Sequence, residues 1–110
     1  MSDCLFCKII AGDIPCKKIF EDADFLAFHD IHPKAPIHAL IIPKKHIESL
    51  AHLEAEDAPL VGQMTLLLKK LAEDLGLAQG FKVQVNTGIN GGQEVFHLHY
   101  HLLGSPTKEN

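Results

Sequence analysis

The sequence predicts one α+β domain with a mainly antiparallel sheet. Strand-like runs are grouped before and after a single long segment of helical periodicity, which is typical of this class. The chain has 110 residues, of which 46% are hydrophobic and 22% are charged. This length and composition are those of an ordinary globular domain, and no linker or internal repeat divides residues 1–110.

The first half of the chain predicts a short helix and three strands. The helix spans residues 5–11, with Ser2 or Asp3 as its N-cap and Gly12 after its end. A short helical turn is expected at 46–50. The expected strands lie at residues 17–21, 25–29 and 38–42.

The second half predicts the long helix and two more strands. Apolar residues recur at three- and four-residue spacing over residues 58–75, which gives the helix one apolar face. Phe81, Val83 and Val85 alternate with polar residues and predict a half-buried strand. A glycine-containing loop at 87–92 precedes a final strand at 95–103.

Charge and composition exclude several classes of partner. The formal net charge is −4, whereas proteins that bind polymeric nucleic acid carry a basic patch. A mononucleotide needs only a small local site and stays possible. No apolar run approaches the ~20 residues that span a bilayer, so no membrane association is expected. The N-terminus lacks a secretory signal, which predicts a cytoplasmic protein.

The final strand contains a row of three histidines. Successive strand side chains point to opposite faces, so His97, His99 and His101 are expected on one face. Phe96, Leu98, Tyr100 and Leu102 are expected on the other face, under the long helix. Such a row suits metal ligation, and it equally suits nucleophilic and acid–base catalysis. Spacing alone does not decide between these chemistries.

The histidine row fits the pattern His-φ-His-φ-His-φ-φ, where φ is hydrophobic. With it, the sequence resembles the Hint branch of the histidine triad (HIT) nucleotide-binding proteins, and the resemblance extends from Cys4 to Gly104. Further matching segments are Phe6-Cys7-Lys8-Ile9-Ile10, Ala27-Phe28-His29-Asp30-Ile31, Ile41-Ile42-Pro43-Lys44-Lys45-His46-Ile47 and Gly91-Gly92-Gln93.

The resemblance implies a five-stranded antiparallel sheet with one long and one short helix, paired as a homodimer with a continuous sheet. It also implies hydrolysis of purine nucleoside phosphoramidates or aminoacyl-adenylates to AMP, without a catalytic cofactor. His99 is then the nucleophile that forms a nucleotidyl-histidine. His101 contacts the phosphate and passes a proton to the leaving group, and His38 completes the proton network.

A nucleotide site follows from the same resemblance. Ile14, Phe28 and Ile31 flank the purine, and Asp30 accepts hydrogen bonds from the ribose hydroxyls. Residues at the phosphate end include the glycine segment, whose backbone N–H groups are expected to face the phosphate. A plain hairpin turn explains these glycines equally well without the family. The phosphate-end residues are Asn86, Gly92, Gln93, Glu94 and Val95.

Cys4 and Cys7 have the spacing of a zinc-binding pair. Two thiolates do not close a tetrahedral site, so an inert or redox-active pair is an alternative. The resemblance to some bacterial members supplies His46 and His97 as the remaining ligands of a structural zinc. Cys16 is expected to be a plain thiol.

Three other functions stay open. A dinucleoside polyphosphate hydrolase belongs to a branch with a glutamine in its triad, whereas His97, His99 and His101 are all histidine. A nucleotide-binding regulatory module would have vestigial catalysis. A metalloenzyme would use the triad as ligands and lose activity with a chelator.

Overall fold

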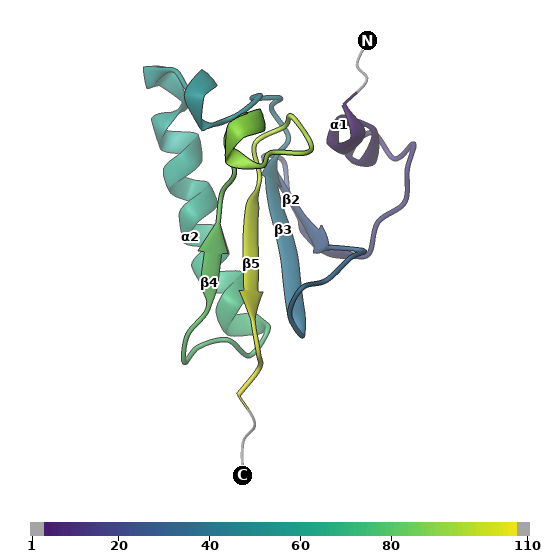
Figure 1. Cartoon of the computed structure of the whole chain (residues 1–110), viewed down its shortest axis with the longest axis vertical. Coiled ribbons are helices and arrows are strands. Elements are labelled where there is room, and N and C mark those ends of the chain that lie inside the picture. The colour runs from purple at the N-terminus through teal and green to yellow at the C-terminus, as the bar shows by residue number, and fades with distance from the viewer. Residues whose placement is uncertain (1–3, 108–110) are drawn as a thin grey trace.

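The computed structural model describes residues 4–107 and combines one sheet with two α-helices (Figure 1). Three short 3₁₀ turns lie at Leu50–His52, Ala55–Asp57 and Ile89–Gly91. In chain order the helices and strands are α1 (Leu5–Ile10), β1 (Lys18–Glu21), β2 (Phe25–His29), β3 (Ile37–Pro43), α2 (Ala58–Asp74), β4 (Lys82–Gln84) and β5 (Tyr100–Gly104).

The strands form a five-stranded antiparallel sheet in the order β1-β2-β3-β5-β4. The predicted α+β fold, with its long and short helices, is confirmed. The connection from β3 to β4 runs through α2, and β5 then inserts between β3 and β4. This insertion places the end of the histidine segment at the centre of the sheet, beside β3.

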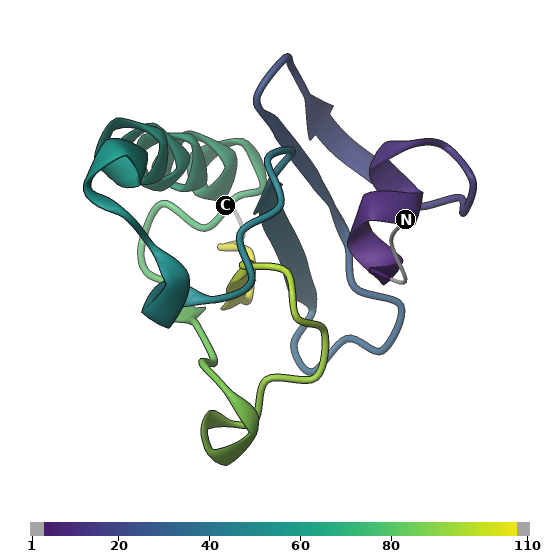
Figure 2. The same cartoon turned by 90° about the horizontal axis from the view of Figure 1, so that it is seen from above.

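The sheet separates two apolar layers (Figure 2). On one face, alternate residues of β3 and β5 such as Ile41 and Leu102 pack against α2 through Met64 and Leu68. On the other face, a smaller cluster packs against Phe6 of α1. Because strand side chains alternate, His38 and His101 point to this second face. The smaller cluster consists of Phe6, Leu26, Phe28, Leu40 and Ile42.

The last strand is shorter than predicted. Residues 95–97 form a bend, and β5 begins only at Tyr100. The reason is a long-range hydrogen bond, since Leu98 N donates to Ile47 O at 2.7 Å instead of to a strand neighbour. The prediction that Phe96 packs under α2 was wrong, because its side chain is exposed.

Two other local predictions were wrong. The turn expected at 46–50 lies at Leu50–His52, where the Ser49 hydroxyl accepts from Ala51 N and caps it. Phe81 and Val83 are each 42% exposed rather than half-buried, because β4 is an edge strand.

The N-terminal helix begins one residue after Cys4, which is its N-cap. Ser2 and Asp3, the predicted caps, lie outside the described residues. Among residues 4–107, neither helix has the length and apolarity to span a bilayer.

Candidate active site and metal cluster

A cavity of about 410 Å³ opens on the α1 side of the sheet. Residues from α1, the segments around β2 and β3, and the 84–103 region line it. The structure thus gathers around one space all the residues predicted for catalysis and nucleotide binding. They are Ile14, Phe28, Asp30, Ile31, His38, Asn86, Gly92, Gln93, Glu94, Val95, His99 and His101.

His99 is buried, and one hydrogen bond fixes the tautomer of its neutral ring. Its Nδ1 lies 2.7 Å from the carbonyl oxygen of His97. A carbonyl only accepts hydrogen bonds, so Nδ1 carries the proton and Nε2 keeps its lone pair. Burial lowers the pKa of His99 below its usual value of 6.5, opposed by this hydrogen bond. His99 therefore presents an unprotonated ring nitrogen at neutral pH.

His38 and His101 form a hydrogen-bonded pair beside His99. The backbone N–H of Lys34 donates to His38 Nδ1 at 3.1 Å, so the proton of neutral His38 lies on Nε2. That nitrogen is 2.9 Å from His101 Nδ1, which must accept. The single ring proton of neutral His101 consequently lies on its Nε2. The rings of His99 and His101 have centroids only 4.9 Å apart.

Burial keeps this pair neutral in the free protein. It lowers the pKa of His38, against the opposing effect of the Asp30 carboxylate. The pKa of His101 falls to about 4, first through burial and then through the nearby His99 and His38. A negatively charged group bound beside His101 would favour its protonated form. In that form His101 Nδ1 also carries a proton, which His38 Nε2 would accept once the His38 proton moves to its own Nδ1 and Lys34 N no longer donates there.

Asp30 lies at the junction of the histidine pair and the open side of the cavity. One carboxylate oxygen accepts from His32 N at 2.8 Å, and the other is 3.4 Å from His38 Nε2. Phe28 is buried in the cavity wall, whereas Ile31 is 80% exposed. Phe28, Asp30 and Ile31 thus form a cavity wall with both apolar and acidic character.

The glycine segment differs from the prediction. The backbone N–H groups of Gly91, Gly92 and Gln93 donate to carbonyls of Gly88 and Ile89 within a tight turn. They are not directed at the cavity, so the expected phosphate cradle from these three donors is not formed. Gly92 has φ +84°, a backbone conformation suited to glycine.

Side chains hold the same turn in place. The Asn86 amide donates to Gly91 O at 2.7 Å. Gln93 is 5% exposed, and its amide accepts from Gly88 N and donates to Glu48 O and Val95 O. Asn86 and Gln93 therefore shape the cavity by fixing the loop that lines it.

Sequence reasoning missed part of the cavity wall. Leu5, Phe6 and Ile9 of α1 line it, as does Lys34. The positive charge of Lys34 contributes to lowering the pKa of both His38 and His101. The apolar positions in α1 were visible in the sequence, but nothing there indicated which face of the sheet the helix covers.

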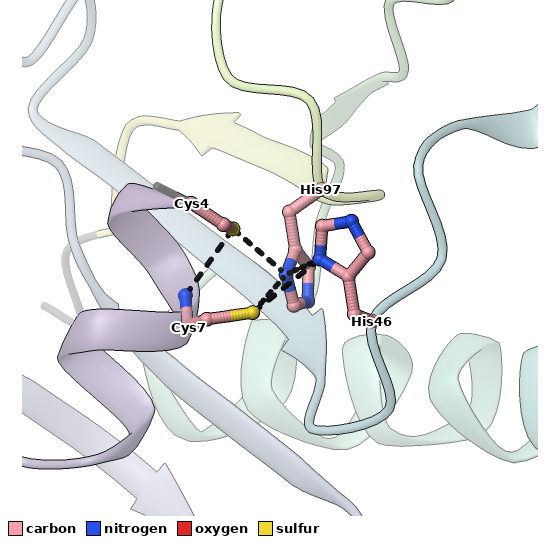
Figure 3. A group of neighbouring side chains, drawn as sticks. All are labelled: Cys4, Cys7, His46 and His97. Atoms are coloured by element: carbon pink, nitrogen blue, oxygen red, sulfur yellow. Dashed lines mark hydrogen bonds between the residues drawn. The ribbon is translucent and has the colours of Figure 1, made fainter. Parts of the chain in front are cut away.

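The four predicted metal ligands meet at a second cluster (Figure 3). Cys4 and Cys7 come from the start of α1, and His46 and His97 come from two separate loops. His97 Nδ1 lies 3.4 Å from Cys4 Sγ, 3.6 Å from Cys7 Sγ and 3.2 Å from His46 Nδ1. Cys7 Sγ lies 3.3 Å from His46 Nδ1.

This donor set fits a tetrahedral zinc ion. Zinc bond lengths of about 2.3 Å to sulfur and about 2.0 Å to nitrogen place such ligands roughly 3.3–3.8 Å apart, which is close to the observed distances. His97 is fully buried, and its Nε2 lies 2.7 Å from the carbonyl oxygen of Pro43. Nε2 therefore carries the proton, and the Nδ1 lone pair faces the cluster. Burial also lowers the pKa of His97 to about 4.

The antiparallel sheet, the long helix on one face and the histidines gathered around a cavity on the other face are the features to compare with known proteins. The chain belongs to the histidine triad family. A family model described as "Scavenger mRNA decapping enzyme C-term binding" matches residues 3–110. Protein HitA of Neisseria gonorrhoeae is 51% identical over 106 residues, which cover 96% of this chain and 99% of HitA.

Solved structures show the same relationship. A HIT family hydrolase from Legionella pneumophila superposes with a TM-score of 0.92 at 47% identity, covering 96% of this chain and 95% of that one. A histidine triad nucleotide-binding protein from Candida albicans superposes with a TM-score of 0.82 at 33% identity, covering 98% and 86% respectively. The fold is therefore that of the family.

The lowered pKa of His101 predicts a pH-dependent loss of stability. The unfolded chain takes up a proton near pH 6.5, but folded His101 does so only near pH 4. The unfolded state thus binds more protons in this window, and the free energy of unfolding must fall as the pH decreases through it. His101→Gln lacks this contribution. We expect native protein to lose stability relative to the variant between about pH 7 and about pH 4.5 in urea titrations. A constant difference would contradict the assignment.

Proposed function

We propose that this protein is a hydrolase of purine nucleoside phosphoramidates and aminoacyl-adenylates, which releases AMP through a nucleotidyl-histidine intermediate. The observation that carries the proposal is the His99 ring, held neutral with Nε2 unprotonated beside the His38–His101 pair in one cavity. Imidazole in this form is a competent nucleophile toward phosphorus. The names of the Legionella and Candida relatives agree with hydrolysis and with nucleotide binding.

In the first step, His99 Nε2 attacks the α-phosphorus and the bond from phosphorus to the amine breaks. The bound phosphoryl group carries a negative charge, which favours a protonated His101. His101 Nε2 then gives its proton to the departing nitrogen. The products are a neutral amine, a neutral His101 and a phosphorylated, positively charged His99.

In the second step, water attacks the same phosphorus and displaces His99. His101 accepts the proton of that water and returns to its protonated form, while His99 leaves as neutral imidazole. The hydrogen bond between His38 and His101 holds the accepting ring in position. One difficult substitution is thereby divided into two easier ones.

The apolar end of the cavity is the proposed purine site. Phe28 and Ile14 supply apolar walls, and exposed Ile31 is available to cover the base when it binds. The Asp30 carboxylate then exchanges its contact with His38 for the ribose hydroxyls. Glu94 also lines the cavity, and we expect its carboxylate to favour a leaving group that carries a cationic amine.

Turnover of adenosine phosphoramidate tests this proposal. We expect the native protein to release AMP and His99→Ala to lose at least about a thousandfold in kcat, because the nucleophile is gone. His52→Ala is the matched control, since this histidine lies outside both the cavity lining and the hydrogen-bonded chain. AMP release is followed by chromatography.

Two results would contradict the proposed activity. If native protein bound AMP but turned over no phosphoramidate, the result would favour a nucleotide-binding regulatory module over a hydrolase. Faster turnover of a diadenosine polyphosphate than of the phosphoramidate would favour the dinucleoside polyphosphate hydrolase.

We also propose a structural zinc ion at Cys4, Cys7, His46 and His97, where it would join α1 to two loops. The ligand spacing and the fixed tautomer of His97 support it, and thiolate ligands suit the reducing cytoplasm proposed for this protein. We expect about one zinc per native chain and loss of zinc in Cys4→Ser. Cys16→Ser is the control and should keep the metal. Equal zinc content in all three proteins, measured by elemental analysis, would exclude the site.

The third proposal is a homodimer with a continuous sheet across β4. This strand lies at the sheet edge, and its Val83 and the preceding Phe81 expose apolar surface. We expect the native protein to sediment as a dimer and Val83→Lys to sediment as a monomer. Ile89→Lys is the control, because Ile89 is an exposed apolar residue (82%) in the Ile89–Gly91 turn, away from β4. Identical sedimentation of both variants would rule out pairing through β4.

A further inference from the structure

Two segments that supply ligands to the metal cluster also supply or contact the proposed nucleophile, His99. Cys4 and Cys7 flank Phe6 on α1, and His97 lies two residues before His99. Both segments also line the cavity. Two separate contacts lead from the cluster to the His99 ring, one through the backbone and the other through an aromatic side chain.

The backbone contact runs through His97. Its ring is held at both nitrogens, because Nε2 donates to Pro43 O and Nδ1 faces the cluster. Its carbonyl is the acceptor for His99 Nδ1. The position of this carbonyl therefore depends on the ring that the cluster holds, and the carbonyl in turn decides which nitrogen of His99 is unprotonated.

The aromatic contact runs through Phe6. Its ring packs edge-to-face against His99, with centroids 5.0 Å apart and planes at 87°. It also contacts His97 and Phe28 in similar geometry. Phe6 is buried, so a shift of α1 would move it directly against the nucleophile.

Neither segment is well held by secondary structure alone. α1 has six residues, and so short a helix is unstable without other contacts. Residues 95–99 lie outside the strand ladder, and Leu98 N is bonded to Ile47 O. A metal ion bound by Cys4, Cys7, His46 and His97 would fix both segments at once.

We propose that Phe6 and His97 are positioning residues through which metal occupancy of the cluster sets the tautomer and orientation of His99. The inference rests on the proposed zinc site and on the proposed activity. When metal is bound, α1 and the 95–99 segment are tied together, and the His97 carbonyl holds the Nδ1 proton of His99. When metal is absent, this carbonyl and the Phe6 ring shift, and His99 populates both tautomers.

Nitrogen NMR of the histidine rings tests the inference without any turnover. In zinc-loaded native protein, we expect His99 to show one tautomer with its proton on Nδ1. After chelation, and in Cys7→Ser, its two ring nitrogens should shift toward averaged values while circular dichroism shows the sheet retained. Cys16→Ser is the matched control and should match the native protein. An unchanged His99 tautomer after metal removal would overturn the inference.

Phe6→Leu tests the aromatic contact with metal still in place. We expect this variant to keep its zinc, to show altered His99 nitrogen signals and to lose about tenfold in kcat, because small misplacements of reacting groups are costly. KM for adenosine phosphoramidate should change less than kcat. Phe6→Tyr should preserve the edge contact and stay closer to native in both quantities.

The outcomes separate this inference from those on which it rests. Native His99 signals and native kcat in Phe6→Leu would overturn the aromatic route. Native protein that binds no zinc would overturn the inference together with the zinc site. A metal-dependent His99 tautomer in protein without phosphoramidase turnover would support the coupling and reject only the proposed activity.

Discussion

The hydrogen bond between His99 Nδ1 and the His97 carbonyl is the constraint on which the site depends. Imidazole has two nitrogens of similar basicity, and only a fixed partner on one makes the other a dependable nucleophile. The carbonyl provides that partner because the chain leaves the strand ladder just before Tyr100. The irregular segment that shortens β5 thus carries the carbonyl that fixes the His99 tautomer.

The main apolar core lies on one face of the sheet, and the cavity with its histidines lies on the other face. Alternation along β3 and β5 sends Ile41 and Leu102 into the layer under α2, where they are fully buried. The intervening residues His38 and His101 face the cavity. A polar network on the second face therefore need not interrupt the main apolar core, and each buried imidazole still finds a partner.

Local patterns predicted what depends on local periodicity. The apolar spacing of 58–75 was sufficient for α2 and the alternation around His101 for part of β5, whereas the cavity residues were predicted from the family resemblance. Long-range hydrogen bonds cannot be read from local sequence patterns, so the bend at 95–97 was not predicted. Strand order was also hidden, and with it the exposure of Phe81 at an edge. The turn hydrogen bonds of Gly91 and Gly92 depend on backbone geometry that glycine content does not specify.

The wall of the cavity around Phe6 and Ile9 comes from a short N-terminal helix, whereas His38 and His101 belong to the sheet and His99 lies just before β5. This part of the wall and the histidines therefore lie in stretches of the chain that can mutate separately. Changes within residues 5–16 can reshape the apolar compartment and alter which base is preferred, while the His38–His101 register stays intact. Substrate range in such a domain can diversify in evolution without rebuilding its chemistry.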